Sequence, residues 1–557
     1  MTLPKLTKQT IQEVYVNSVK TYANELAFSY VDEGGYTFSE VDRQVTAIIK
    51  SLRAFGLAKG DRVAILGENG PAWSLAYLAV ATLGGVTVPI LPDFHKSEVH
   101  HIIRNSGSRV LFISSKLAHK VAEIRLKELE LMVSLDNLSL NIENVKCMNL
   151  LDLIQSEHRL KQKDLGPIRF SVEEDDLVEI LYTSGTTGHS KGVMLTNKNI
   201  VANAISAVEM IGLDHKDRLV SILPQSHAYE CTCGFILPFM VGAKVYYIKG
   251  LHTAQVLLPA VQKIKPTVIL SVPLIMDKIY KKKVLGEINS KALSKVIYKL
   301  SPKLVYKIAG KKLYQAFGGN LRIMVFGGAA TPPEVEAFLS ESGFPYITGY
   351  GLTEAAPLLT VNPVGKVKQQ SAGMVVPSVS LRIAEVDPVT GVGEIQAQGP
   401  NIMRGYYKNE EATKRTFTDD GWLITGDRGT LDEDGYLFIK GRSKNLIVGP
   451  SGENIYPEEI EFHLSQYVYV LESLVYEKDS RIVARVHLDY DALEEHFHLS
   501  TLDGSQAAKT IEKLLEEIRA DANSKVASYA RIHRIIEQPE EFEKTPTKKI
   551  KRYLYAE

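Results

Sequence analysis

The sequence predicts an α/β protein: a large N-terminal domain of layered α/β subdomains with a small β-rich subdomain, then a small, separate domain of mixed α and β elements. Apolar runs rich in β-branched residues alternate with helical segments as far as Gly328. Short strands with tight glycine turns follow Leu381, and compact mixed elements follow Asn445. At 557 residues, the chain is also too long for a single core.

The N-terminal strands are expected where apolar runs end in glycine, proline or polar turns, as parallel strands between helices do. These runs are RVAIL (62–66), VLFIS (110–114), LVSILP (219–224), TVILSVP (267–273) and LRIMVFGG (321–328). The uncharged stretch Ala72–Leu91 has about the length of a membrane span. Because Gly84 and Pro89 interrupt it, we expect a buried helix up to Leu83 and a strand over Val86–Val88 instead.

The segments LRIAEV, GEIQAQG and GYLFIKG after Leu381 predict the β-rich subdomain. The charged segment Gly441–Asn445 is predicted to be a linker, with domains at 1–440 and 446–557 on either side. A surface loop within one domain is the alternative. In the C-terminal domain, a long helix is expected from about Gln506 to Asn523.

Composition limits the classes of function. Lys plus Arg and Asp plus Glu both number 65, a balance that disfavours a nucleic-acid partner. Three cysteines cannot form a disulfide framework, which favours a reducing compartment. The N-terminal sequence MTLPKLTKQTIQEVY lacks the apolar core of a signal peptide. A cytoplasmic location is therefore expected.

The segment Lys278–Lys312 is strongly basic, with eleven lysines and one carboxylate, Glu287. Lysines recur at every fourth position over Lys291–Lys311, with apolar residues between them and a break at Pro302. A solvated helix face is one interpretation. The other is an amphipathic surface that rests on anionic lipid, at the inner face of the membrane.

One short loop, YTSGTTGHSKG (182–192), has the composition of a phosphate-binding loop. Glycines let backbone N–H groups approach an anion, hydroxyls add donors, and a lysine adds positive charge. The loop is not a Walker A motif, because His189 and Ser190 separate Gly188 from Lys191.

Seven motifs follow this loop in order: LPQSHAYE (223–230), FGGAATPPEV (326–335), ITGYGLTE (347–354), GWLITGD (421–427), KGRSKNLIV (440–448), GENIYPEEIE (452–461) and EKTPTKKIKR (543–552). Together with YTFSEVD and GDRVAILGENGPAW near the N-terminus, they resemble the adenylate-forming superfamily over nearly the whole chain. That superfamily includes acyl-CoA synthetases, nonribosomal peptide adenylation domains and luciferases. The chain is most similar to bacterial long-chain fatty acid–CoA ligases.

The resemblance implies a reaction in two steps, with ATP, Mg²⁺ and coenzyme A as cofactors. The carboxylate of a fatty acid attacks the α-phosphate of ATP to give acyl-AMP and pyrophosphate, and a thiol then takes the acyl group. Lys549 is expected to meet the charge that develops during adenylation, His227 to position the carboxylate, and Glu354 to bind Mg²⁺. The resemblance also implies that the C-terminal domain is a mobile α+β lid, with its hinge in the linker 441–445 at Lys444.

The resemblance also assigns the nucleotide site. Tyr350 would stack on adenine, Asp427 would accept the ribose hydroxyls, Arg442 would hold ribose or phosphate, and Gly452 lies in the thiol-tunnel segment. The expected cofactor-binding residues are Thr183, Ser184, Gly185, Thr186, Thr187, Gly188, Lys191, Gly328, Ala329, Tyr350, Gly351, Thr353, Asp427, Arg442 and Gly452. The expected metal ligands are Thr183, Ser184 and Glu354.

The chain departs from the family pattern at several positions. Ser190 replaces a common proline before the loop lysine, and Asn197 stands where long-chain enzymes often have histidine. The last motif has Lys548 in place of its glycine, so two adjacent lysines compete for the catalytic role. Spacing from Thr545 favours Lys549, with Lys548 as the alternative.

The substrate is expected to be a medium- or long-chain fatty acid. Gly351 stands where acetyl-specific relatives place a tryptophan that closes the acyl pocket, and no acidic residue is available in LPQSHA to pair with an amino-acid substrate. CoA is the expected acceptor. An acyl carrier protein as acceptor, and a non-catalytic nucleotide- or lipid-binding relative, remain alternatives.

Overall fold

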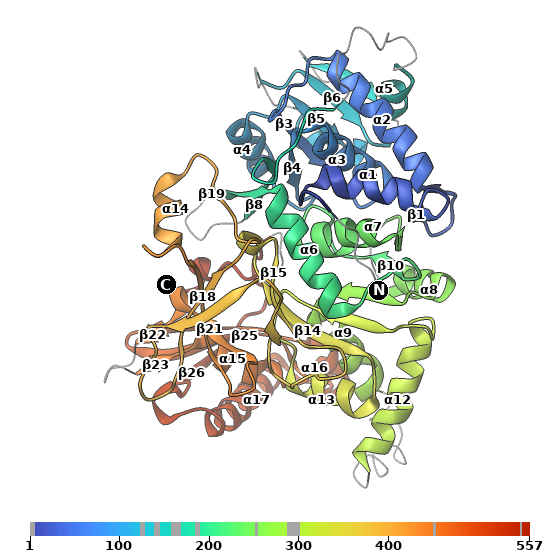
Figure 1. Ribbon diagram of the computed structural model, residues 1–557. Coiled ribbons are helices and arrows are strands. Elements are labelled where there is room, and N and C mark those ends of the chain that lie inside the picture. The colour runs from blue at the N-terminus through green and yellow to red at the C-terminus, as the bar shows by residue number, and fades with distance from the viewer. Residues whose placement is uncertain are drawn as a thin grey trace.

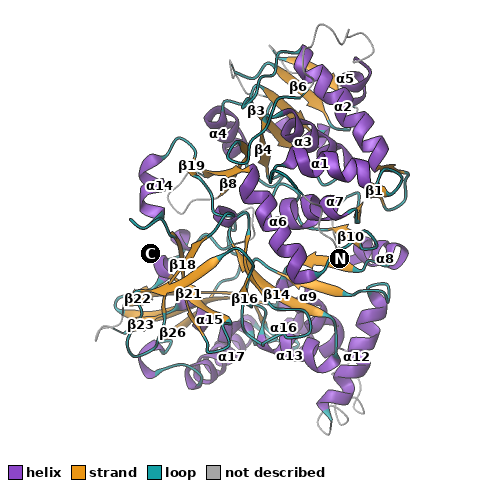
Figure 2. Ribbon diagram, in the orientation of Figure 1, coloured by secondary structure: helices purple, strands orange, loops and turns teal. Residues whose placement is uncertain are grey.

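The computed structural model describes residues 6–122, 128–136, 138, 145–156, 169–183, 190–250, 254–286, 301–448, 453–545 and 549–556. Two large, mostly parallel sheets form the N-terminal part of the chain, and helices and strands are mixed throughout (Figures 1 and 2). The predicted α/β class is therefore confirmed.

The first large sheet has the order β16-β15-β14-β13-β12-β10-β11-β1-β2. Its pairs from β1 through β11, β10, β12 and β13 to β14 are parallel, and antiparallel strands lie at its edges. The strands are β1 (Leu26–Tyr30), β2 (Gly35–Thr37), β10 (Arg218–Ser221), β11 (Lys244–Tyr247), β12 (Val268–Ser271), β13 (Ile323–Phe326), β14 (Tyr346–Gly351), β15 (Leu358–Val361) and β16 (Met374–Val375).

The second large sheet has the order β19-β9-β8-β4-β3-β5-β6-β7. The strands from β8 to β7 are parallel, whereas β9 pairs antiparallel with both β8 and β19. The strands are β3 (Arg62–Leu66), β4 (Val86–Ile90), β5 (Val110–Ile113), β6 (Leu131–Ser134), β7 (Lys146–Asn149), β8 (Leu177–Thr183), β9 (Lys191–Thr196) and β19 (Gly405–Tyr406).

Helices cover both faces of the second sheet. Val63 and Ile65 of β3 belong to a core shared with α1, α2, α3, α6 and α7, whereas Ala64 and Leu66 belong to a cluster with α4 on the opposite face. The helices of the N-terminal part of the chain are α1 (Ile11–Thr21), α2 (Phe38–Ala54), α3 (Pro71–Leu83), α4 (Lys96–Ser106), α5 (Leu150–Ser156), α6 (Asn197–Ile211), α7 (Leu237–Val241), α8 (Ala254–Ile264), α9 (Pro273–Ile279), α12 (Pro302–Ala316), α13 (Pro333–Ser342) and α14 (Glu410–Thr416).

The uncharged stretch Ala72–Leu91 folds as expected. Helix α3 is buried and ends at Gly84, whose φ of 100° is one that side chains with a Cβ rarely adopt. Strand β4 then runs through Pro89 with every residue buried. No helix within the described residues is long and apolar enough to cross a membrane.

The β-rich part is a separate antiparallel sheet with the order β17-β18-β20-β21. Its strands are β17 (Ser380–Ala384), β18 (Gly393–Gln398), β20 (Leu423–Leu431) and β21 (Leu437–Arg442). The expected linker needs correction at its start, because Gly441 and Arg442 lie in β21 and pair with Arg428 and Asp427. A short helical turn, Ser443–Asn445, follows.

The residues beyond this turn build their own hydrophobic core. Their strands are β22 (Ile447–Val448), β23 (Asn454–Ile455), β24 (Val470–Lys478), β25 (Arg481–Leu488) and β26 (Arg534–Glu537), and their helices are α15 (Pro457–Ser465), α16 (Tyr490–Phe497) and α17 (Gly504–Ser524). The long helix predicted from Gln506 to Asn523 is thus confirmed as α17.

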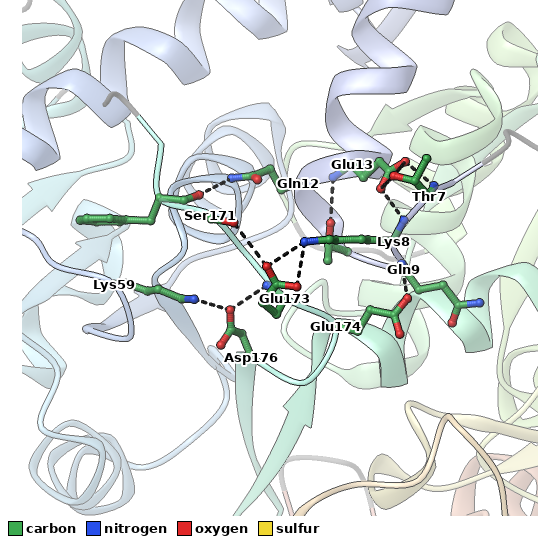
Figure 3. A network of polar contacts seen from close by, with 12 residues as sticks. Thr7, Lys8, Gln9, Gln12, Glu13, Lys59, Ser171, Glu173, Glu174 and Asp176 are labelled. Atoms are coloured by element: carbon green, nitrogen blue, oxygen red, sulfur yellow. Dashed lines mark hydrogen bonds and ion pairs between the residues drawn. The ribbon is translucent and has the colours of Figure 1, made fainter. Parts of the chain in front are cut away.

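A polar network fastens the N-terminal segment to the chain that leads into β8 (Figure 3). Lys8 Nζ lies 2.7 Å from Glu173 Oε1, and the Gln9 backbone N–H donates to Glu174 at 2.9 Å. Lys59 Nζ pairs with Asp176 at 2.6 Å. These contacts hold the start of the strand that carries the phosphate-loop motif.

Candidate active site

Strands β8 and β9 hold the two ends of the phosphate-loop motif together. Thr183, the last residue of β8, pairs with Lys191, the first residue of β9. Ser190 is buried and its hydroxyl donates to Glu98 Oε2 at 2.7 Å, which gives this departure from the family proline an anchoring contact. The predicted phosphate contacts Ser184, Gly185, Thr186, Thr187 and Gly188 lie outside the described residues.

A tyrosine that the sequence analysis missed joins Lys191 to Glu354. Tyr406 donates its hydroxyl to Glu354 Oε1 at 2.8 Å, and Lys191 Nζ lies 5.0 Å from the centroid of the same ring. Burial and the charge of Glu354 raise the pKa of Tyr406, so the phenol stays a donor at neutral pH. Strand β19, which carries Tyr406, pairs with β9, where Tyr406 lies opposite Val193. The expected phosphate contact Lys191 and the expected metal ligand Glu354 therefore both contact the side chain of Tyr406.

Tyr350, Asp427 and Arg442 meet where β14 faces the β20–β21 hairpin. The Tyr350 hydroxyl donates to Asp427 Oδ2 at 2.7 Å, and Arg442 Nε lies 3.2 Å from Asp427 Oδ1. The Asp427 side chain is 9% exposed, whereas that of Arg442 is 53% exposed. This arrangement holds a buried carboxylate with one fixed phenol and one accessible cation beside it.

Glycines allow close approach around this site. Gly327 is buried, and a Cβ there would lie 3.1 Å from the ring of Tyr229. Gly328 has a φ of 85°, and it and Ala329 are exposed after the end of β13.

Thr353 and Glu354 follow β14 in a single helical turn, and both are half-buried.

The interpretation of Gly351 as an opened wall of the acyl pocket needs correction. An ideal Cβ at Gly351 would lie 2.0 Å from the Pro357 carbonyl oxygen and 3.1 Å from the Leu358 Cα. A side chain there would collide with backbone before it reached any pocket. The close return of the chain at Pro357 thus explains this glycine, and the argument for a long acyl chain cannot rest on it.

His227 is held as a neutral imidazole. Its Nδ1 accepts the Tyr229 backbone N–H at 3.2 Å, which leaves the proton on Nε2. Burial, assisted by the charge of Lys549, lowers the pKa of His227 to about 4. A buried π-helical segment, Glu230–Ile236, follows directly, and such segments often mark functional sites. A neutral N–H donor suits a positioning role.

Lys549 lies in the C-terminal segment, next to the antiparallel bridge between Lys544 and Ile550. The Thr545 backbone N–H donates to the Lys549 carbonyl at 2.7 Å, and the Lys549 N–H donates to Thr545 Oγ1 at 3.2 Å. Although much of its side chain is exposed, the surrounding protein desolvates the ammonium and lowers its pKa. Arg442 lowers this pKa further, while Asp427 and Glu354 oppose both effects. Lys549 therefore shares one electrostatic environment with the nucleotide-site candidates.

Some predicted residues have no described geometry. Gly452 and the alternative lysine Lys548 lie outside the described residues. Lys444, the predicted hinge, is exposed in the turn after β21. Asn197, which stands where the family often has histidine, is buried at the start of α6. Its side-chain oxygen accepts a hydrogen bond from the Ile11 backbone N–H at 3.0 Å and so links α6 to the start of α1.

Comparisons with known proteins identify the family. The sequence profile described as AMP-binding enzyme matches residues 16–407. The chain belongs to the family of AMP-binding enzymes. The feruloyl-CoA synthase of Amycolatopsis sp is 30% identical over 77% of this AMP-binding enzyme and 78% of the relative. The long-chain-fatty-acid–CoA ligase FadD15 of Mycobacterium bovis is 29% identical over 94% and 90%, respectively.

A solved structure shares the fold of this AMP-binding enzyme. The anthranilate CoA ligase AuaEII in complex with anthranoyl-AMP superposes with a TM-score of 0.78, with 22% identity and coverage of 98% of this chain and 96% of that chain. The profile match and the sequence relatives confirm the predicted adenylate-forming acyl-CoA synthetase at the level of the family. These relatives are named for different acids.

The predicted cofactors, ATP with Mg²⁺ and CoA, agree with the CoA ligases among the relatives. One solved structure of similar fold, O-succinylbenzoate coenzyme A synthetase from Bacillus subtilis in complex with ATP and magnesium ion, superposes with a TM-score of 0.72, 23% identity and coverage of 97% of this chain and 98% of that chain. The residues present fit such a metal. Mg²⁺ is usually held through one or two carboxylates and the phosphates of its substrate rather than by a protein cage. Within the described residues, no cluster of three or more His, Cys, Asp or Glu could hold a metal by itself. Glu354, with one oxygen fixed by Tyr406, suits the single-carboxylate arrangement.

Proposed function

We propose that this enzyme activates a medium- or long-chain fatty acid as acyl-AMP and transfers the acyl group to CoA. The observation that carries the adenylation step of this proposal is the electrostatic influence between Lys549 and the nucleotide-site candidates. An ammonium from the C-terminal domain lies in the electrostatic field of Arg442, Asp427 and Glu354 and acts on His227. A cation placed there would offset the negative charge that grows between carboxylate and α-phosphate.

The other residues have complementary roles. Thr183 and Lys191, with the loop between them, hold the β- and γ-phosphates, and Glu354 holds Mg²⁺. Tyr350 packs against adenine while Asp427 accepts the ribose hydroxyls, with Gly328 and Ala329 flanking the base. Neutral His227 donates Nε2–H to the carboxylate of the acid, where an imidazolium would instead form an ion pair.

The described residues enclose an apolar cavity of about 10 Å³, which has room for about one water molecule and is too small, as it stands, for an alkyl chain. It lies between the first large sheet and helices α8 and α9, and it is lined by Val220, Ile222, Leu257, Val261, Ile269, Ser271, Ile275, Met276, Phe317 and Met324. Ile222 precedes His227 by five residues, and Met324 precedes Gly327 by three. We propose that the alkyl chain enters here by moving these side chains apart, and each methylene that is then buried contributes about 0.8 kcal/mol.

The C-terminal domain acts as a lid that takes two orientations. After adenylation, Lys549 has no further task, and a thiol needs a path to the acyl carbonyl. We place the hinge at Lys444 and the thiol path along the segment of Gly452. The mycobacterial relative, a long-chain-fatty-acid–CoA ligase, supports CoA as the acceptor.

Contact with a membrane is a further part of the proposal. On α12, Lys303, Lys307 and Lys311 are exposed, and Leu304 and Ile308 between them are 51% and 54% exposed. This helix lies at the edge of the molecule (Figure 1). The combination suits peripheral attachment of a cytoplasmic enzyme to anionic lipid. The lysines at 291, 295 and 299 lie outside the described residues.

One assay tests the substrate and the acceptor. The purified protein is given ATP, Mg²⁺ and acids of increasing chain length, with ferulic acid as an aromatic competitor, and CoA or acyl carrier protein separately. We expect pyrophosphate release to rise with chain length and thioester to form with CoA. Preference for ferulic acid would contradict the fatty-acid proposal, and thioester with acyl carrier protein alone would contradict the acceptor. No release with any acid would indicate a non-catalytic protein.

Sedimentation tests the membrane contact. The protein should sediment with vesicles that contain anionic phospholipid and be released as salt rises, because such attraction is screened over about 10 Å. Lys303→Gln with Lys307→Gln, and separately Leu304→Ser with Ile308→Ser, should weaken sedimentation. Binding that ignores salt and both pairs of changes would contradict the proposal.

A further inference from the structure

A lysine of the N-terminal domain, distant in sequence from the predicted hinge at Lys444, forms a hydrogen bond with the C-terminal domain. Lys281 lies in the π-helical segment Tyr280–Leu285 that continues α9. Its Nζ donates to the Ser465 carbonyl oxygen at 3.1 Å and lies 3.2 Å from Asp277 Oδ2. The side chains of Lys281 and Asp277 are only 16% and 15% exposed.

The contact suits both partners chemically. Ser465 is the last residue of α15, and the final carbonyls of a helix lack partners within the helix. An ammonium also interacts favourably with the negative end of a helix. Asp277 lies one helical turn before Lys281 and forms an ion pair with its ammonium. This ion pair can orient the lysine before the C-terminal domain docks.

Helix α15 connects this contact to the hinge region. At its other end, Asn445 Nδ2 donates to Glu458 Oε1 at 2.5 Å, and a Cβ at Gly441 would lie 2.8 Å from Glu458 Oε2. The helix spans about 12 Å from Pro457 to Ser465. A rotation of about 20° around its hinge end would move Ser465 by about 4 Å, which is enough to break a hydrogen bond.

We propose that Lys281 is a positioning residue for the adenylation step. Its ammonium holds the end of α15 and keeps the lid in the orientation that presents Lys549 to the nucleotide site. The inference rests on the proposed function of the enzyme, because it concerns which of two lid orientations is favoured. Since Lys281 lies with the N-terminal domain and Ser465 with the lid, the contact exists only while this orientation lasts.

The direct consequence is an asymmetry between the two half-reactions. Loss of the contact disfavours the orientation seen here relative to the other one. Adenylation, which needs Lys549 at the site, should slow. Transfer of an acyl group from supplied acyl-AMP to CoA should be unchanged or faster, because the orientation that serves it becomes more populated.

Three variants of the full-length enzyme test this inference: Lys281→Met, Lys281→Arg and Lys283→Met. Lys283 is exposed on the same π-helical segment and provides the matched control. We expect Lys281→Met to lower fatty-acid-dependent pyrophosphate release about tenfold and to leave thioester formation from acyl-AMP intact. Lys281→Arg, whose guanidinium can donate to both Asp277 and Ser465, should recover most of the loss, and Lys283→Met should match the wild type.

A second readout does not depend on activity. Backbone hydrogen exchange at the end of α15, followed in peptides covering Phe462–Tyr467, should be faster in Lys281→Met than in Lys283→Met, because an undocked helix end frays more readily. Equal loss in both half-reactions, or equal exchange in the two variants, would overturn the role of Lys281. If the wild type formed no acyl-AMP, the proposed function would fail, and the exchange comparison alone would decide whether Lys281 holds the lid.

Discussion

Replacing Tyr406 with phenylalanine removes one hydroxyl from the centre of the candidate site. The ring that faces Lys191 at 5.0 Å is retained, while the 2.8 Å hydrogen bond to Glu354 is lost. The change therefore removes the contact with the metal-binding candidate Glu354 and keeps the contact with the phosphate-binding candidate Lys191.

The size of the effect follows from the kind of bond that is lost. A hydrogen bond to a charged acceptor contributes about 1.5–3 kcal/mol, and loss of a group that orients a metal ligand typically costs about 10–100-fold in metal affinity or activity. We expect the Mg²⁺ concentration for half-maximal acyl-AMP formation to rise about tenfold or more. The KM for ATP at saturating Mg²⁺ should change less, because Lys191 keeps its aromatic neighbour.

The assay is fatty-acid-dependent pyrophosphate release at fixed ATP, titrated with Mg²⁺. Tyr407→Phe provides the matched control, since it alters the adjacent phenol, whose ring faces Lys408 instead. Tyr406→Leu, which also removes the ring, should raise the KM for ATP as well. Wild-type Mg²⁺ dependence in Tyr406→Phe would refute the assignment of Glu354 as a metal ligand supported by Tyr406.

Three other changes give distinct outcomes. Lys444→Pro should spare acyl-AMP formation and abolish thioester formation, because proline fixes φ near −65° at the proposed hinge, and loss of both activities would place the hinge elsewhere. Ile275→Phe should fill the apolar cavity and lower kcat/KM for long acids at least tenfold while sparing hexanoate, whereas an unchanged chain-length profile would exclude the cavity as the alkyl site. Burial raises the pKa of Glu230 to about 8, so the folded state keeps a proton that the unfolded state releases near pH 4.3. Between these two pH values, ionisation of Glu230 lowers the free energy of unfolding by about 1.4 kcal/mol for each pH unit that the pH rises. Glu230→Gln should accordingly lose less thermal stability between pH 5 and 8 than the wild type, and parallel curves would contradict the buried, protonated state.

Local patterns predicted much of the fold. The helix and strand within Ala72–Leu91 follow from a glycine stop and β-branched residues, and α17 follows from its own periodicity. The linker boundary could not be predicted, because Gly441 and Arg442 join β21 through pairing with β20, and nothing in their own composition shows it.

The candidate site residues were proposed from local motifs. Contacts between residues that lie far apart in the sequence could not be predicted in this way. Tyr406 lies 52 residues from Glu354 and far from Lys191, so its role depends on the pairing of β19 with β9. Gly351 shows the converse, because its motif suggested a role in substrate choice, whereas the nearby Pro357 carbonyl explains the missing side chain.

The central claim is that Lys549 serves adenylation of a fatty acid and nothing else. The most direct test compares wild type and Lys549→Ala in the two half-reactions, with pyrophosphate release from ATP and a long-chain acid in one, and thioester formation from supplied acyl-AMP and CoA in the other. We predict that the substitution lowers the first by a factor of at least about 100 and leaves the second within about twofold. Equal losses in both half-reactions, or an unaffected first step, would contradict the account.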